Sequence, residues 1–139
     1  GGSQSIDNNI KVTMVNAVHG SGIAGESSEG MVYGGVANGY ILKFENGFTI
    51  YFAGDTAVFS DMKLIGDIYS PNLSVLPIGD HFTMGPLEAS YATKLLGSNN
   101  VIPFHYGTFP VLVGTPEEYI KLVSDLDVNV YVMNPGDVL

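Results

Sequence analysis

The alternation of hydrophobic and polar positions predicts β-strands first, and then strands that alternate with helices. Apolar, β-prone runs cover residues 10–18, 36–44, 48–53, 73–78, 101–104 and 128–133. Glu45-Asn46-Gly47, between the second and third runs, is typical of a hairpin turn. The Gly- and Ser-rich residues 19–35 predict a long loop with a role beyond connecting two strands.

Helix signals separate the later strands. Helices are predicted around residues 59–65, from 86 to about 96, and from 116 to about 126. Pro86 is a favoured first helical residue and Gly97 a favoured stop, and the apolar face between them is expected to hold Leu87, Tyr91 and Leu95. Thr115-Pro116-Glu117-Glu118 is a capping box. This order predicts an α/β fold in one unit that spans residues 1–139.

Composition and charge narrow the classes of function. The 139 residues are 45% hydrophobic, so a sizeable core is expected. The net charge is −9 and the chain has no arginine, which argues against nucleic-acid binding because phosphate contacts need clustered cationic side chains. The absence of cysteine leaves His, Asp and Glu as metal ligands. No run resembles a membrane span or a signal peptide, and we expect a cytoplasmic protein without membrane partners.

Four side chains suited to metal binding follow the ends of predicted strands. They are Asp55 and the three histidines of the chain, His19, His81 and His105. Loops at the carboxyl ends of strands meet in one crevice in α/β sheets, which favours a shared site. Taken singly, each residue has a structural alternative: Asp55 could cap the next helix, and His81 could pair with Asp80. Together they favour a divalent ion, because imidazole and carboxylate groups suit zinc, manganese and iron.

Aromatic and methionine side chains accompany these four residues. Phe82, Met84, Tyr106 and Phe109 stand beside the histidines in the sequence. They are candidates for the wall of a substrate pocket, with core packing as the alternative for at least half of them.

Longer motifs around the four residues resemble the metallo-β-lactamase superfamily. The segments that carry the resemblance are residues 17–22 (AVHGSG), 50–56 (IYFAGDT), 76–86 (LPIGDHFTMGP) and 102–110 (IPFHYGTFP). The Gly-Asp-Thr and Phe-Thr-Met-Gly-Pro motifs in this order are specific. The chain resembles the C-terminal half of that fold, and in particular its metal-dependent hydrolases similar to ascorbate-phosphate lactonases.

The resemblance implies a four-layered αββα sandwich with two divalent metal ions at one edge of its sheets. By motif position, His19 matches a ligand of the first ion, Asp55 the carboxylate that bridges both ions, and His105 a ligand of the second. His81 matches a residue near the substrate that donates a proton or orients a group, although Asp80 stands where the family carries a glycine. Zinc is the first expectation for both ions, with manganese, iron or nickel as alternatives.

One motif of the family has no counterpart in the chain. It is His-x-His-x-Asp-His, which supplies the other metal ligands. Gly1-Gly2-Ser3 alone would read as a tag remnant, but it matches a Gly-Gly-Ser within longer relatives. We therefore expect the C-terminal half of a split domain that binds a separate N-terminal half chain as a heteromer. A half studied alone is the other explanation, and a self-paired dimer or further oligomerisation is the alternative arrangement.

The resemblance implies a binuclear metal-dependent hydrolase that is active in the assembled complex. A hydroxide that bridges the metals would attack an ester, lactone, amide or phosphoester in a small-molecule substrate, with Asp55 and His81 as catalytic residues. Whether this chain alone is an enzyme stays open at this point. Two alternatives come from other classes: a non-catalytic structural or regulatory half-domain, and a nuclease, which the charge of −9 disfavours.

Overall fold

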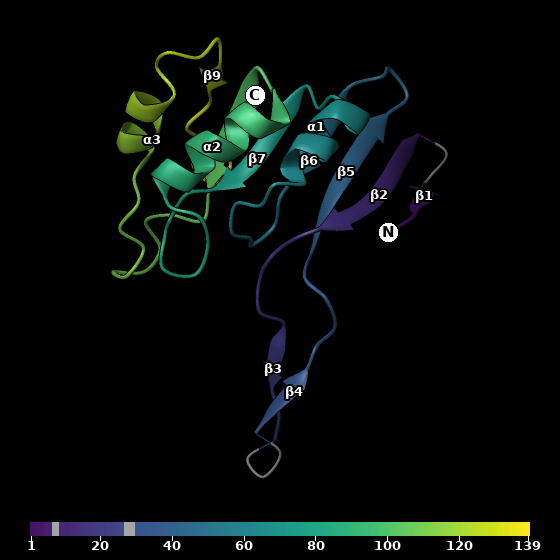
Figure 1. Ribbon diagram of the computed structural model, residues 1–139, viewed down its shortest axis with the longest axis vertical. Helices are drawn as coiled ribbons and strands as arrows, with labels where there is room; N and C mark the ends of the chain where they lie inside the picture. Colours follow the sequence, from purple (N-terminus) through teal and green to yellow (C-terminus); the bar gives the residue numbers. More distant parts are fainter. Residues whose placement is uncertain (7–8, 27–29) are drawn as a thin grey trace.

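One large mixed sheet organises the chain. The computed structural model describes residues 1–6, 9–26 and 30–139. Its seven-stranded sheet has the order β1-β2-β5-β6-β7-β8-β9 (Figure 1). The strands are β1 Ser3–Ile6, β2 Ile10–Asn16, β5 Asn38–Phe44, β6 Thr49–Phe52, β7 Leu73–Pro77, β8 Asn100–Phe104 and β9 Asn129–Val130.

The directions of the strands bring five carboxyl ends to one end of the sheet. β5 pairs antiparallel with both β2 and β6, so β2 and β6 run the same way. β6, β7, β8 and β9 pair in parallel. The predicted turn between β5 and β6 forms, with the Gly47 N–H donating to the Phe44 carbonyl at 2.9 Å. β2, β6, β7 and β8 therefore deliver the loops that follow them to a single edge.

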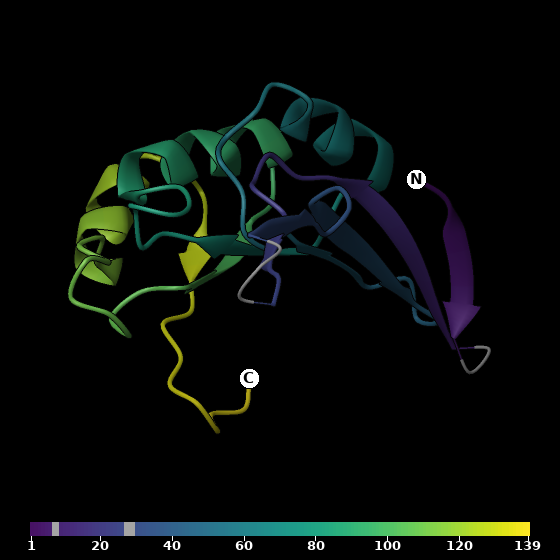
Figure 2. The ribbon, with the colours of Figure 1, turned by 90° about the horizontal axis from the view of Figure 1, so that it is seen from below.

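Helices cover one face of this sheet. α1 (Met62–Tyr69), α2 (Pro86–Leu96) and α3 (Pro116–Leu122) lie on the same side, above the sheet in Figure 2. The core between the layers holds large side chains that are at most 2% exposed, among them Ile41, Tyr51, Met62, Leu76, Ile78, Val101 and Tyr119. The arrangement confirms the predicted α/β class.

The predicted ends of α2 and the start of α3 are confirmed. Pro86 begins α2, and Gly97 ends it with a left-handed φ of 66°. The Thr115 Oγ1 accepts a hydrogen bond from the Glu118 N–H at 3.3 Å, which caps α3. The predicted α3 was too long, because the helix ends at Leu122. The predicted start of α1 was too early, because the helix begins at Met62.

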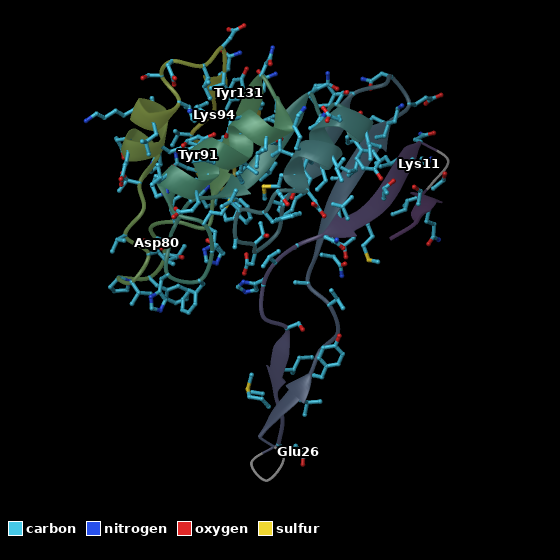
Figure 3. The ribbon with its side chains drawn as sticks, viewed as in Figure 1. Lys11, Glu26, Asp80, Tyr91, Lys94 and Tyr131 are labelled. Carbon is cyan, nitrogen blue, oxygen red and sulfur yellow. The ribbon has the colours of Figure 1, made fainter. Side chains whose placement is uncertain are left out.

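The buried face of α2 differs in part from the prediction: Leu95 packs against the core, but the other two predicted residues do not. Leu87 and Tyr91 are 52% and 58% exposed, whereas the buried positions include the small residues Ala89 and Ala92. Small side chains let the helix lie close to the sheet. Close packing therefore decides which residues of α2 are buried more than the size of an apolar side chain does. Tyr91 instead lies on the surface. The Lys94 ammonium lies over the Tyr91 ring, 5.6 Å from the ring centre (Figure 3).

The segment predicted as a long loop contains a small hairpin. β3 (Gly22–Ala24) and β4 (Met31–Tyr33) pair antiparallel and project away from the body (Figure 1). Strands of three residues are too short for the alternation of polar and apolar positions to reveal them. Residues 27–29 of the predicted loop lie outside the described residues.

The face of the sheet opposite the helices is apolar and open. Along it the register aligns Met14 with Tyr40 and Tyr40 with Phe52, and these side chains are 37%, 42% and 40% exposed. Phe104 continues the row, because its ring centre lies 5.3 Å from that of Phe52. Within the described part of the chain no helix lies on this side, and Figure 2 shows the C-terminal segment running below it. We refer to this surface as the open face.

None of the helices in the described part of the chain is both long and apolar enough to span a bilayer.

A buried hydrogen bond between α2 and α3 provides a test of the helical layer. The Tyr119 hydroxyl is fully buried and lies 2.6 Å from the Thr93 Oγ1, and burial raises the pKa of Tyr119 from 10 to about 12. Its folded-state pKa is raised, so its contribution to stability is complete below about pH 10 and is lost as the pH rises towards 12. We expect Tyr119→Phe to lower the free energy of unfolding by about 1 kcal/mol near neutral pH and to weaken this alkaline loss.

Urea unfolding at neutral pH and at about pH 11 measures both effects. Tyr91→Phe, which removes an exposed hydroxyl from the same helical layer, is the matched control. Equal urea midpoints for Tyr119→Phe and the unaltered protein at both pH values would contradict the expectation.

Candidate metal centre

Two imidazoles and one carboxylate meet where β2, β6 and β8 end. The Nε2 atom of His19 lies 3.9 Å from the Asp55 Oδ2, and the Nε2 atom of His105 lies 3.7 Å from the same oxygen. The three residues come from loops far apart in the sequence, and each loop follows a strand that runs towards this edge. The structure thus brings together three of the four candidate site residues.

These separations fit ligands of a shared ion better than hydrogen bonds. Both exceed the range of a normal nitrogen–oxygen hydrogen bond. Two ligand atoms that each lie about 2.0–2.2 Å from one ion are about 3–3.5 Å apart, somewhat closer than the two observed pairs. His19 and His105 each form an imidazole–carboxylate pair with Asp55.

The described residues supply only part of a complete ligand set. Among the described residues, no group of three or more His, Cys, Asp or Glu side chains is arranged so that it could hold a metal ion alone. The His19–Asp55 and His105–Asp55 pairs share one carboxylate. A bridging Asp55 would produce this arrangement, in which each ion would have one of the two histidines as a ligand. The donor chemistry therefore fits two divalent ions, provided that further ligands come from elsewhere.

The three side chains are accessible to an ion. Their exposed fractions are 29% for His19, 42% for Asp55 and 24% for His105. The Nδ1 atom of His105 is buried and has no hydrogen-bond partner among the described residues. The nitrogen of this ring that is placed for a ligand is therefore Nε2, which faces Asp55.

The position of His105 depends on close packing between the ends of β7 and β8. The Ile78 N–H donates to the Phe104 carbonyl at 3.0 Å, and His105 has a left-handed φ of 56°. A Cβ atom added to Gly79 would lie 2.0 Å from the His105 carbonyl oxygen. Glycine at position 79 therefore lets the backbone of His105 approach this closely.

His81 lies on a separate loop at the same end of the molecule. Figure 3 places the neighbouring Asp80 at the end of the body from which the β3–β4 hairpin projects. His81 is exposed, its ring meets that of Phe82 edge to face at 4.4 Å, and no described carboxylate lies within 4.0 Å of its ring nitrogens. The structure therefore does not include His81 in the cluster around Asp55.

The local geometry explains why a glycine was expected at position 80. Asp80 and His81 both adopt left-handed φ angles, of 65° and 60°. Glycine adopts this conformation at the lowest cost, but a short polar side chain can stabilise it by a local hydrogen bond. The Asp80 Oδ1 accepts such a bond from the His81 N–H at 2.7 Å. Asp80 thus interacts with the backbone of His81 rather than with its ring.

Two of the structural alternatives are now decided. Asp55 does not cap the next helix, because the N-cap residue of α1 is Asp61. Met84 is 1% exposed and belongs to the core, which is the alternative that the sequence left open for it. Phe82 and Phe109 are 53% and 62% exposed on the loops that follow β7 and β8, and they remain candidates for a wall.

The fold and the cluster define a class of protein, and comparison with known families gives the same class. The family model described as the beta-lactamase superfamily domain matches residues 1–106, and the chain belongs to this family. Its relatives include metal-dependent hydrolases at about 50% identity. The family resemblance and the fold class seen in the sequence are thereby confirmed.

Three of the most similar proteins show how much of the family's length the chain covers. A UPF0173 metal-dependent hydrolase of Rubrobacter xylanophilus is 50% identical over 132 residues, which are 94% of this chain and 54% of the relative. A UPF0173 metal-dependent hydrolase of Koribacter versatilis is 51% identical over 137 residues, which are 99% of this chain and 57% of the relative. The solved structure of Igni18, a metallo hydrolase of Ignicoccus hospitalis, superposes with a TM-score of 0.81 at 36% identity. The superposition covers 99% of this chain and 56% of Igni18. The chain thus spans a little over half the length of these proteins.

Gly79 offers a test of how His105 is positioned. We expect Gly79→Ala to destabilise the fold by about 1–3 kcal/mol, because the new methyl group meets a backbone oxygen that can move only with His105. Thermal unfolding measures this loss. Gly20→Ala is the control, since a Cβ there meets nothing within 4 Å and the residue neighbours His19 in the same centre. A melting temperature of Gly79→Ala equal to that of Gly20→Ala would refute the packing argument.

Proposed function

We propose that this chain forms part of a binuclear metal-dependent hydrolase in which His19, Asp55 and His105 bind two divalent ions. The observation that carries the proposal is the approach of both histidine Nε2 atoms to one oxygen of Asp55. The names of its relatives as metal-dependent hydrolases support the same class.

Each residue has a distinct role in the proposed centre. His19 with Asp55 would hold the first ion, His105 with Asp55 the second, and Asp55 would bridge the two. When bound, divalent ions supply a water whose pKa is lowered to near neutrality, which makes hydroxide available for hydrolysis. Zinc is the first choice, and manganese, iron and nickel accept the same donors.

His81 is the proposed proton donor or orienting group for the substrate. It is exposed on the loop after β7, at the same edge of the sheet as Asp55. From there an imidazole could protonate a leaving group or stabilise a developing oxyanion of an ester, lactone, amide or phosphoester. The exposed rings of Phe82 and Phe109 would line the apolar side of a small-molecule pocket.

The remaining ligands would come from an N-terminal half that covers the open face. Three observations support this part of the proposal. The ligand pairs are incomplete, the chain spans a little over half of its relatives, and the open face exposes a continuous apolar row. Contiguous apolar surface of this kind usually marks an interface. We propose that this half packs against the open face and that the assembled protein is cytoplasmic.

A non-catalytic half-domain is the alternative from another class. A purely structural role gives no reason for two histidines from different loops to approach one carboxylate oxygen. The hydrolase proposal accounts for that approach, and for this reason we prefer it.

Removal of the shared carboxylate tests the proposed function directly. We expect Asp55→Ala in the assembled protein to lower hydrolysis by at least about 100-fold and to release at least one ion, because both ions lose a ligand. Turnover of a panel of lactones and phosphoesters, together with metal content by elemental analysis, measures both changes.

His81→Ala is the matched comparison for this experiment. It should lower turnover while the metal content stays at the level of the unaltered protein, because His81 lies outside the cluster around Asp55. Full activity and full metal content in Asp55→Ala would sink the assignment of Asp55.

A further inference from the structure

Thr56 connects the two loops that carry His19 and Asp55. It follows Asp55 directly, and its side chain is completely buried. The Thr56 Oγ1 accepts a hydrogen bond from the Val18 N–H at 2.9 Å and donates one to the Ala57 carbonyl at 2.8 Å. Since Val18 directly precedes His19, one hydroxyl links the neighbours of two residues of the metal centre.

Backbone hydrogen bonds around Thr56 extend this connection. The Ala57 N–H donates to the Val18 carbonyl at 2.9 Å, so the two loops are joined in both directions. The Met84 N–H donates to the Thr56 carbonyl at 3.0 Å, which adds the loop that carries His81. Three of the loops at this edge of the sheet therefore meet at one buried residue.

The hydroxyl has a role here that an apolar side chain cannot fill. Without an acceptor at position 56, the Val18 N–H would lose its protein partner, and a partly buried donor of this kind could pair only with water instead. The local loop would relax to expose that N–H to water. Such a relaxation would move His19, the next residue along the chain.

His19 depends on this anchor more than His105 does. His105 follows β8, which pairs with β7 and β9, and packs against Gly79 on the neighbouring loop. His19 lies beyond the end of β2, and the chain after it leads into the projecting β3–β4 hairpin (Figure 1). The bonds of Val18 to Thr56 and Ala57 therefore hold the segment that presents His19 to Asp55.

We infer that Thr56 is a positioning residue that sets the separation between His19 and Asp55. This inference rests on the proposed binding of metal by those two residues. Thr56 itself would not contact an ion. Ligands must be held within roughly 0.5 Å of their productive positions, so loss of the hydroxyl should weaken the ion that His19 shares with Asp55 and spare the one bound by His105.

Substitution of the hydroxyl by a methyl group tests the inference. In the assembled protein loaded with Zn²⁺, Thr56→Val should lower the affinity of one of the two ions at least about tenfold in competition with a chelator. In the metal-free protein the Val18 amide should exchange with deuterium faster. Thr56→Ser keeps the hydroxyl and should restore both properties. Thr56→Cys, with its weakly accepting thiol, replaces Thr56→Val if that variant does not fold.

Thr93→Val is the matched control. Thr93 is also buried, and its Oγ1 donates to the Ala89 carbonyl at 2.9 Å and lies 2.6 Å from the Tyr119 hydroxyl, between two helices. Thr93→Val should lose about as much stability as Thr56→Val but should keep the affinity for both ions. The positioning role would be overturned if Thr93→Val weakened zinc binding as much as Thr56→Val does. It would also be overturned if the Val18 amide exchanged with deuterium at the same rate in Thr56→Val as in the unaltered protein.

The two proposals fail in different ways. An unaltered assembled protein that binds no Zn²⁺ would refute the proposed function. An unaltered protein that binds Zn²⁺, with a Thr56→Val variant of the same affinity, would refute the positioning role alone.

Discussion

The pairing of β5 between β2 and β6 is the constraint on which the candidate site depends. It makes β2 run parallel to β6, and the parallel pairing of β6, β7 and β8 then aligns four strands in one direction. The loops that carry His19, Asp55, His81 and His105 all leave the sheet at the same edge as a result. A binding site at the carboxyl ends of the strands follows from this geometry.

The same sheet relates the candidate metal centre to the open face. Its helices cover one face, where the core lies, while the open face carries the row from Met14 through Tyr40 and Phe52 to Phe104. The two histidine–carboxylate pairs stand at the edge of this apolar surface and lack further ligands among the described residues. An additional layer on the open face would bury the apolar row and could bring the missing ligands to that edge.

Much of this arrangement could be predicted from residues with strong local preferences. Pro86, Gly97 and Thr115 mark helix ends through backbone geometry and capping, and these signals do not depend on the rest of the fold. The cluster of His19, Asp55 and His105 could be predicted because each residue follows the end of a recognisable strand. Family motifs then gave the class, which the match over residues 1–106 confirmed.

Features that depend on contacts between distant residues could not be predicted in this way. The buried face of α2 is set by the space between the helix and the sheet, so small residues replaced the expected Leu87 and Tyr91. The role of Thr56 was invisible because the hydrogen bond from the Val18 N–H spans 38 positions in the sequence. The β3–β4 hairpin and the edge strand β1 lack the length or the apolar content that makes a strand recognisable.

The central claim is the proposal that His19, Asp55 and His105 hold two divalent ions together with ligands from outside residues 1–139. The most direct test is to purify the native protein without a cleavable tag and to measure the intact mass of every chain present and the metal content of the complex. The account predicts about two divalent ions for each assembled protein, whether the missing ligands belong to the same polypeptide or to another. An assembled protein that contains the remaining ligands and is nevertheless free of metal would contradict it.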